Sequence, residues 1–242
     1  MRSTRKPRGR SARGECHMTR AANTGLAERL ARLSPAKRAF VEQRLRAARE
    51  VAPDSPIVRT PGDGPAPLSF AQELLWEIDQ SAPGLSTYSV PCALRVEGEL
   101  DVPRRQRALD ALVRRHETLR TTFIRHDGEP VAIVGAPCPV ALRSIDLSGC
   151  AGGPEADDAL DAVLREAAGE AFDLARDLLL RATLVRLRDD VHVLVLAWHH
   201  VASDADSRDI LLRDLAALYN DPAGIFPPLP LRYSDFAVWQ RR

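Results

Sequence analysis

Two adjacent histidines give this chain its clearest potential for chemistry. His199 and His200 follow an apolar run in WHHVASDADS, and Asp204 lies four residues after the second histidine. A neutral imidazole can take a proton from an amine or a hydroxyl near pH 7, because its unperturbed pKa is about 6.5. Successive strand residues face opposite sides, so we expect one histidine to be catalytic and the other structural. The alternative is a buried strand that simply ends in two hydrogen-bonded histidines.

Metal chemistry is disfavoured at this position. Only one histidine and Asp204 could converge on an ion, and the sequence offers no third ligand. The cysteines form no CxxC pair, which argues against a zinc site and against a disulfide framework; they are Cys16, Cys92, Cys138 and Cys150. We therefore expect no bound metal or cofactor, and a reducing, cytoplasmic setting.

The elements around the histidines predict how they are positioned. VHVLVLAW, directly before them, is apolar at almost every position, which is typical of a central strand buried on both faces. Ser203 or Asp204 can cap the helix ADSRDILLRDLAALYN that follows. The histidines therefore lie between the end of a buried strand and a helix N-terminus, where ligands tend to bind in α/β proteins.

Helix and strand patterns alternate through the rest of this region. Ser69 can cap a helix and Asp101 opens another, and Pro91 predicts that the strand TYSVPCALRVEG lies at a sheet edge or contains an irregularity. Asp127-Gly128 separates two apolar runs, which indicates a β-hairpin. The pattern predicts a mixed α/β domain in which helices flank a central sheet.

The N-terminal part of the chain has a different character. Residues 1–24 are rich in arginine and predict a disordered basic tail, unless Met18 is the true start. Residues 25–67 predict a short helical leader followed by a proline-rich linker from residue 52. The folded domain is thus expected to span residues 68–242.

The overall composition excludes several classes of partner. The 34 Lys and Arg residues nearly balance the 33 Asp and Glu residues, so a net charge of +1 gives no field that would favour nucleic acid. No apolar stretch follows the basic first twenty residues, which excludes a signal peptide or membrane span there. We expect partners to be recognised by local features, and neither nucleic acid nor membrane to be among them.

Four stretches together resemble a known family. HHVASD matches HHxxxD, the signature of condensation domains in nonribosomal peptide synthetases and of the wider chloramphenicol acetyltransferase-like acyltransferases. Three more stretches resemble condensation-domain motifs and occur in the family's order: LSFAQELLW at 68–76, RHETLRTTF at 115–123 and YSDFAVW at 233–239. The resemblance implies an α/β lobe of the chloramphenicol acetyltransferase type.

The resemblance also implies a reaction. A carrier protein presents an aminoacyl or peptidyl thioester on its phosphopantetheine arm, and an amine on a second carrier attacks the carbonyl to form an amide. His200 matches the residue that faces the tunnel and positions the amine or takes its proton. His199 and Asp204 match structural members of the motif, with Asp204 tied to an arginine. Arg120 matches an arginine near the active site, although it could instead only pair with a nearby carboxylate.

Other motif residues are expected to serve structure. His116 follows Leu109 and Val113 at helical spacing, so we expect a core or helix-end histidine. Large aromatic rings chiefly supply buried area, and the packing residues expected on this ground are Trp76, Phe123 and Trp239. Tyr233 and Asp235 are expected to fix a turn.

Some positions depart from the family pattern. Ala205 stands where relatives commonly have glycine, and a methyl group there could narrow the tunnel or tilt the loop. Asp206 adds a carboxylate beside the site that could raise the pKa of a nearby histidine. Leu74 replaces a usual arginine of the first motif.

The four motifs all belong to the first of the two lobes that form a condensation domain around its tunnel. We therefore expect residues 68–242 to be the N-terminal lobe, inactive without the missing C-terminal lobe and exposing apolar surface meant for it. Two alternatives stay open. One is a non-catalytic module that docks carrier proteins, and the other is a trimeric CoA-dependent acyltransferase with its site between subunits.

Overall fold

The computed structural model describes residues 56–61, 64–150, 154–224 and 226–242. Contacts divide the chain into two units, Met1–Arg44 and Leu45–Arg242, and every described residue belongs to the second. The predicted basic tail and helical leader therefore lie outside the described residues. No helix within the described ranges combines the length and the apolar character that crossing a membrane requires.

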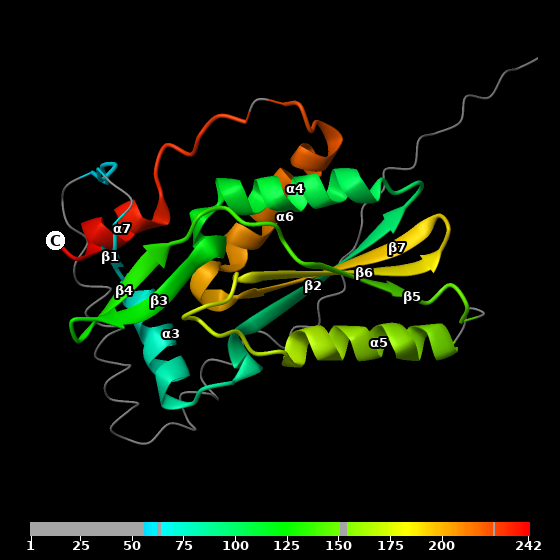
Figure 1. Ribbon diagram of the computed structural model, residues 1–242, viewed down its shortest axis with the longest axis horizontal. Helices are drawn as coiled ribbons and strands as arrows, with labels where there is room; N and C mark the ends of the chain where they lie inside the picture. Colours follow the sequence, from blue (N-terminus) through cyan, green and yellow to red (C-terminus); the bar gives the residue numbers. More distant parts are fainter. Residues whose placement is uncertain (1–55, 62–63, 151–153, 225) are drawn as a thin grey trace, which may run out of the picture. The chain divides into compact units, whose positions relative to one another are not determined.

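A four-stranded mixed sheet in the order β2-β7-β6-β5 forms the centre of the unit (Figure 1). The nine residues of β7 (Val191–His199) are all buried, which confirms the predicted central strand. Strand β7 pairs antiparallel with β2 (Ser89–Glu97) on one side and with β6 (Leu180–Arg188) on the other. Strand β5 (Leu142–Asp146) then pairs parallel with β6. Pro91 lies on the edge strand β2, the position in a sheet where a residue without an N–H is best tolerated.

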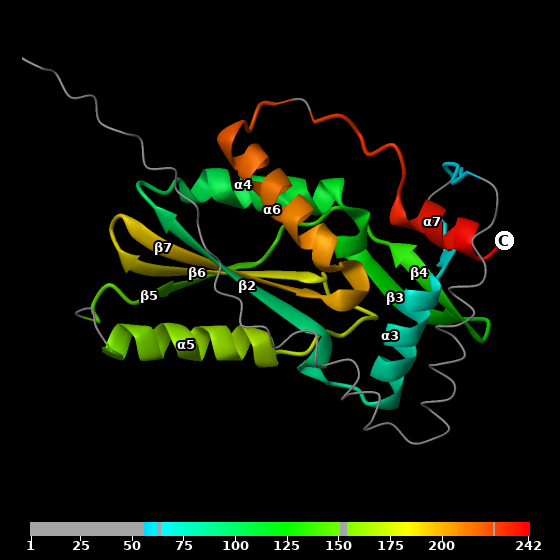
Figure 2. The same cartoon turned by 180° about the vertical axis from the view of Figure 1, so that it is seen from behind.

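Helices cover both faces of this sheet. In Figures 1 and 2, α4 (Val102–Arg115) and α6 (Ala205–Asn220) lie on one face and α5 (Pro154–Gly169) lies on the other. Alternate residues of β7 supply the two cores, because successive side chains of a strand point in opposite directions. Leu194 and Leu196 join the core that contains α4 and α6, whereas Val193 and Val195 pack with α5.

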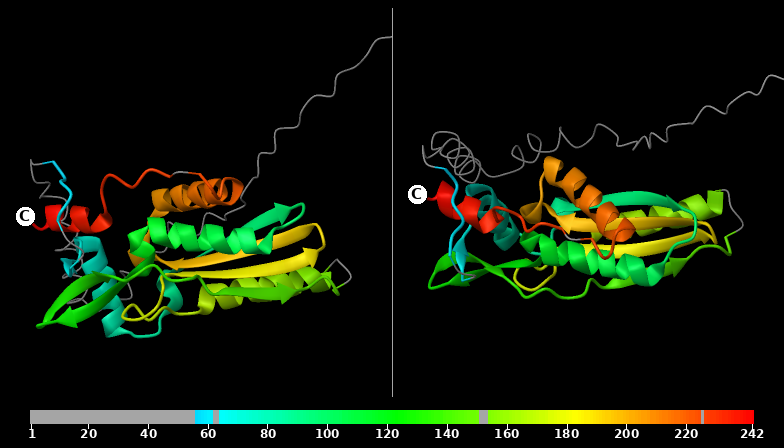
Figure 3. Two further views of the ribbon diagram at one scale, coloured as in Figure 1. Left: turned by 45° about the horizontal axis from the view of Figure 1, so that its top comes forward. Right: turned by 90° about the horizontal axis from the view of Figure 1, so that it is seen from above.

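A second sheet of three strands has the order β1-β4-β3. Strands β3 (Thr121–His126) and β4 (Glu129–Val134) form the predicted hairpin, which extends away from the four-stranded sheet in Figure 3. Its turn residues have positive φ angles, 51° at Asp127 and 86° at Gly128, as a tight two-residue turn requires. Helix α3 (Phe70–Ser81) begins after the predicted cap Ser69, and α7 (Tyr233–Gln240) is the last helix of the described chain.

The predicted boundary at residue 68 is too late. Strand β1 (Ala66–Pro67) pairs with β4 inside the segment assigned to the linker, and the Thr60 backbone N–H donates to Asp235 at 2.8 Å. A proline is tolerated in β1 because this strand lies at the sheet edge and uses only one side for pairing. Strand β5 was also absent from the prediction, since a short, partly exposed strand acquires its identity only by pairing with β6.

Candidate functional site

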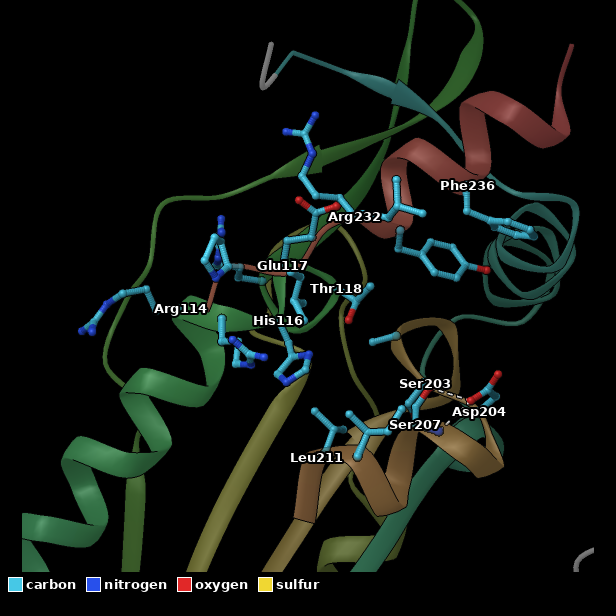
Figure 4. A pocket seen from close by; sticks show the side chains of 18 of the residues that line it. Arg114, His116, Glu117, Thr118, Ser203, Asp204, Ser207, Leu211, Arg232 and Phe236 are labelled. Atoms are coloured by element: carbon cyan, nitrogen blue, oxygen red, sulfur yellow. Dashed lines mark hydrogen bonds between the residues drawn. The ribbon is translucent and has the colours of Figure 1, made fainter. Parts of the chain in front are cut away.

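The four sequence motifs meet around one pocket of about 1010 Å³. Helix α3 supplies one wall, and the end of α4 with the 3-10 turn η2 (Glu117–Arg120) supplies another. The turn η3 (His200–Ala202), the first turns of α6 and the chain between α6 and α7 complete it. Figure 4 shows the side chains of His116, Glu117 and Thr118 on one side and those of Ser203 and Asp204 on the other.

The His199 side chain lies in the interior. The residue is 2% exposed, and its ring centroid lies 6.1 Å from that of Tyr88 and 6.0 Å from that of Phe172. Its Nδ1 accepts a hydrogen bond from the backbone N–H of Val201 at 3.0 Å. Burial, with a smaller effect of His200, lowers the pKa of His199 to about 4, so the ring is neutral near pH 7.

The neighbouring His200 is exposed and lines the pocket. Its Nδ1 lies 2.6 Å from the carbonyl oxygen of Ser203. A carbonyl oxygen can only accept, so Nδ1 carries the hydrogen and donates it. The neutral ring is then left with Nε2 as an acceptor, which is the state of an imidazole that can take a proton.

Asp204 caps helix α6. Its Oδ1 accepts hydrogen bonds from the Ser207 backbone N–H at 2.9 Å and from the Ser207 hydroxyl at 2.5 Å. The hydrogen bonds from the Ser207 side chain and backbone lower the pKa of Asp204. The resemblance implies an arginine partner for Asp204, and the structure corrects this expectation. No ion pair within the described residues joins Asp204 to an arginine. Here the carboxylate satisfies a helix N-terminus instead.

Arg120 also lines the pocket, but its guanidinium contacts backbone carbonyls. Nε donates to the Val113 oxygen at 3.3 Å, and Nη1 donates to the Gly135 oxygen. Arg120 thus joins the end of α4 to the chain just after β4. A carboxylate partner, the alternative drawn from the sequence, is not found for Arg120 among the described ion pairs.

The sequence did not predict a buried carboxylate that contacts the pocket residues Arg115 and His116. Asp214, 6% exposed, accepts from Arg115 Nε at 2.9 Å and pairs with His116 Nε2 at 3.0 Å. Arg115 reaches on to the Pro227 carbonyl at 2.7 Å and so holds the chain between α6 and α7. A signal existed, because Asp214 falls between Leu211 and Leu218 on the apolar face of α6. A carboxylate at such a position is unusual without buried partners.

The last motif is tied to the first and the second. The hydroxyls of Tyr233 and Ser69 lie 3.0 Å apart, and Glu117 Oε1 accepts from the Ser234 hydroxyl at 2.9 Å. Asp235 is 1% exposed and accepts from the Thr60 hydroxyl at 2.6 Å. These contacts place α7 against α3 and η2, and so build the pocket wall around them.

The aromatic residues of the motifs differ in burial. Trp76 and Phe123 are each 1% exposed and belong to the core, whereas Trp239 is half-buried and packs against Phe236 with ring centroids 5.7 Å apart. Across the ranges that the structure describes, no group of three or more His, Cys, Asp or Glu side chains is placed to hold a metal ion.

Comparison with known proteins decides the family. The model of the family described as "Condensation domain" matches residues 63–242. The chain belongs to the condensation-domain family. Phosphinothricin tripeptide synthetase PhsC of Streptomyces viridochromogenes is 44% identical over 223 residues, which cover 90% of this chain and 20% of that protein. Enniatin synthetase of Fusarium oxysporum is 40% identical over 198 residues, 78% of this chain and 6% of that protein.

Solved structures confirm the predicted α/β fold of the chloramphenicol acetyltransferase-like type. The X-domain from teicoplanin biosynthesis is 31% identical, with a TM-score of 0.68, and the match covers 77% of this chain and 40% of that one. A condensation domain that mediates chain release from the enacyloxin polyketide synthase is 30% identical, with a TM-score of 0.63; the match covers 86% of this chain and 42% of that one. This condensation-domain chain therefore spans about two fifths of those solved chains.

Proposed function

We propose that this chain is the N-terminal lobe of a nonribosomal peptide synthetase condensation domain that joins a carrier-bound aminoacyl or peptidyl thioester to a carrier-bound amine. The observation that carries the proposal is the exposed His200 at the pocket, with Nδ1 bonded to the Ser203 carbonyl. That contact leaves Nε2 as the acceptor. The family match and the relationship to peptide synthetases support the reaction class.

In the proposed reaction the amine nitrogen attacks the thioester carbonyl, the new C–N bond forms, and the C–S bond breaks. His200 Nε2 holds the amine and takes the proton that this nitrogen loses, and the departing thiolate of the donor arm receives a proton. His199 and Asp204 keep the turn between β7 and α6 in place through Val201 and Ser207. Arg120 supports the pocket wall that it lines, through its hydrogen bond to the Val113 carbonyl.

The partners in this proposal are carrier protein domains and a C-terminal lobe. The carriers deliver the phosphopantetheine arms, so no cofactor binds this chain directly. Three apolar side chains at the pocket are exposed: Ile210 by 41%, Leu231 by 39% and Tyr233 by 36%. Such neighbouring apolar surface is what a second lobe would cover. We expect the lobe alone to form no product.

Reconstitution tests the proposal. The chain is completed with a C-terminal condensation lobe and supplied with two loaded carriers, and the amide product is detected by mass spectrometry. We expect product with the unaltered chain, and at least a hundredfold lower rate with His200→Ala. His126→Ala, at an exposed hairpin position, is the matched control and should keep the full rate. An unchanged rate in His200→Ala would remove this residue from the mechanism.

A second candidate is a binding module without catalysis. It is favoured by similarity to the X-domain from teicoplanin biosynthesis, which was solved in complex with OxyB. This chain is 31% identical to the matched chain of that complex, with a TM-score of 0.69. In that case the completed protein would bind loaded carriers without forming product, and His200→Ala would leave binding unchanged. Product formation in the reconstituted system would exclude it.

A further inference from the structure

A second imidazole lines the same pocket in a fixed orientation. His116 follows the last turn of α4, and its Nε2 lies 3.0 Å from Oδ2 of Asp214. Burial by itself would raise the pKa of Asp214, but hydrogen bonds from Arg115, His116 and Arg213 outweigh it and lower that pKa. The group is therefore a carboxylate near pH 7 and can only accept. His116 must donate from Nε2, and its neutral ring then carries the lone pair on Nδ1.

The neutral state of His116 has a physical cause. Burial lowers the pKa of His116 more than the hydrogen bond and charge of Asp214 raise it, and the Arg115 and Arg213 charges add to the lowering. The two arginines also compensate the Asp214 charge, with Arg115 Nε at 2.9 Å and Arg213 Nη2 at 3.2 Å. Asp214 thus fixes which nitrogen of His116 is protonated without drawing a second proton onto the ring.

The remaining ring nitrogen is accessible. No group in the described ranges donates to Nδ1 of His116, and this atom is not among the fully buried side-chain atoms that lack a partner. The His116 side chain is 12% exposed. Figure 4 shows the ring between the end of α4 and Leu211 of α6, at the pocket wall.

The charged groups of the pocket that are held by other contacts serve less well as this kind of acceptor. Guanidinium groups such as that of Arg120 only donate, and Arg120 already donates to backbone carbonyls. The carboxylates of Glu117 and Asp204 accept from Ser234 and Ser207 in holding the walls. His116 and His200 thus each bring a neutral ring nitrogen to the pocket that can accept a hydrogen bond.

We propose that Nδ1 of His116 accepts a hydrogen bond from an amide N–H of the bound acyl or arm substrate, with Asp214 as the positioning residue. This inference rests on the proposed function, since it assigns the bound molecule to the carrier-linked class. His116 is a substrate-binding residue, separate from the site of proton transfer at His200.

Two variants separate binding from structure. In His116→Gln the amide nitrogen can still donate to Asp214, but no acceptor remains at the Nδ1 position. In His116→Asn the amide oxygen can occupy the Nδ1 position, but the bond to Asp214 is lost. His126→Gln, on the exposed end of β3, is the matched control.

The probes are pantetheine alone and alanine joined to pantetheine through a non-hydrolysable amide, titrated into the chain and followed by nitrogen-15 NMR of the histidines. We expect an unprotonated Nδ1 in His116 whose resonance moves on binding. His116→Gln should keep the melting temperature and weaken binding roughly three- to tenfold, the size of one hydrogen bond. His116→Asn should retain more of the affinity than His116→Gln, and His126→Gln should bind as the unaltered chain does. Weakening with both probes assigns the N–H to the arm, and weakening with the alanyl probe alone assigns it to the acyl group.

A protonated Nδ1, unaltered affinity in His116→Gln, or no measurable binding to the unaltered chain would each overturn the inference. The assay measures binding and needs no amide formation. Absence of product in the reconstituted domain would therefore contradict the proposed function and leave the binding result standing. Likewise, failure of the binding test would overturn the role of His116 and leave the proposed function standing.

Discussion

His199 and His200 are adjacent in the chain, yet their rings lie in opposite environments: His199 is buried at 2% exposure, and His200 is exposed at the pocket. The strand ends at His199, and η3 begins at His200. Each ring is held through Nδ1, which accepts from Val201 in His199 and donates to Ser203 in His200. The two neutral tautomers are therefore opposite.

The tautomer of His200 can be measured directly. At a pH above the titration range of histidine, nitrogen-15 spectra should show a proton on Nδ1 of His200 and none on Nε2. His200→Asn can keep an N–H donor for the Ser203 carbonyl, whereas His200→Ala cannot. We expect His200→Ala to be less stable than His200→Asn by about 1 kcal/mol in urea unfolding. A proton on Nε2, or equal stability of the two variants, would contradict this geometry.

Mild acid should destabilise the fold through His199. Its pKa is lowered to about 4 when folded, against about 6.5 in an unfolded chain. The unfolded state binds more protons, so the free energy of unfolding falls as the pH drops from about 6.5 to about 4, by up to about 3 kcal/mol. His116 and His192, whose pKa values burial also lowers, add to this slope.

Substitution of the buried His199 isolates its contribution to the pH dependence of the free energy of unfolding. In His199→Asn an amide oxygen can accept from Val201, but the ring packing against Tyr88 and Phe172 is lost. We expect a loss of about 2 kcal/mol at pH 7 and a shallower dependence on pH. Urea unfolding at several pH values measures both, and a slope as steep as that of the unaltered chain would count against the assignment.

Asp235 should stabilise the fold around Thr60 above pH 4. Burial alone would raise its pKa, but hydrogen bonds from Thr60 and Arg232 lower it to about 2. A carboxyl with a depressed folded pKa contributes stability above its unfolded value of about 4 and loses that contribution as the pH falls towards 2. Asp235→Asn should cost about 2 kcal/mol at pH 7, with a smaller difference near pH 2.

The Thr60 contact offers a control for Asp235. Thr60→Val removes the hydroxyl bond at 2.6 Å and keeps the backbone bond at 2.8 Å. It should cost less than Asp235→Asn, about 1 kcal/mol by thermal unfolding. Equal stability of Asp235→Asn and the unaltered chain at pH 7 would show that the carboxylate does not anchor this segment.

Glycine at position 205 should bring no benefit to the fold. Ala205 is exposed as the first residue of α6, and its φ is not positive, so its methyl group meets no backbone strain. Ala205→Gly should lower stability by about 0.5 kcal/mol, because glycine loses more freedom on entering a helix. In the reconstituted assay we expect the rate to stay within about twofold. A large gain in rate would show that the methyl group narrows the path of the substrate.

The elements with strong local patterns were predicted correctly. The apolar run before His199 gave the buried β7, Asp127-Gly128 gave the hairpin, and Asp101 and Ser69 cap helices as expected. Each depends on interactions within a few residues, namely side-chain periodicity, a cap or a turn geometry. Such interactions can be read from a sequence without knowing the rest of the fold.

The features that were missed depend on partners far along the chain. Strand β1 exists by pairing with β4, and Asp235 is anchored by Thr60, which is 175 residues away. Asp214 meets Arg115 across 99 residues, so its place on the apolar face of α6 signals a buried partner without saying which residue it is. The expected arginine partner of Asp204 is wrong for a different, local reason, since the carboxylate binds the nearest unsatisfied donors, those of Ser207.

The sequence by itself determined the family, the order of the motifs and the presence of a strand that ends in two histidines before a helix. Only the tertiary structure decided which ring reaches the pocket, which nitrogen of each ring carries the proton, and which residues form the other pocket walls. Periodicity alternates side chains along a strand but does not say where the strand stops. Packing decides that, because His199 still lies in the strand and packs with Tyr88 and Phe172, whereas the turn that begins at His200 takes the next side chain out of the sheet.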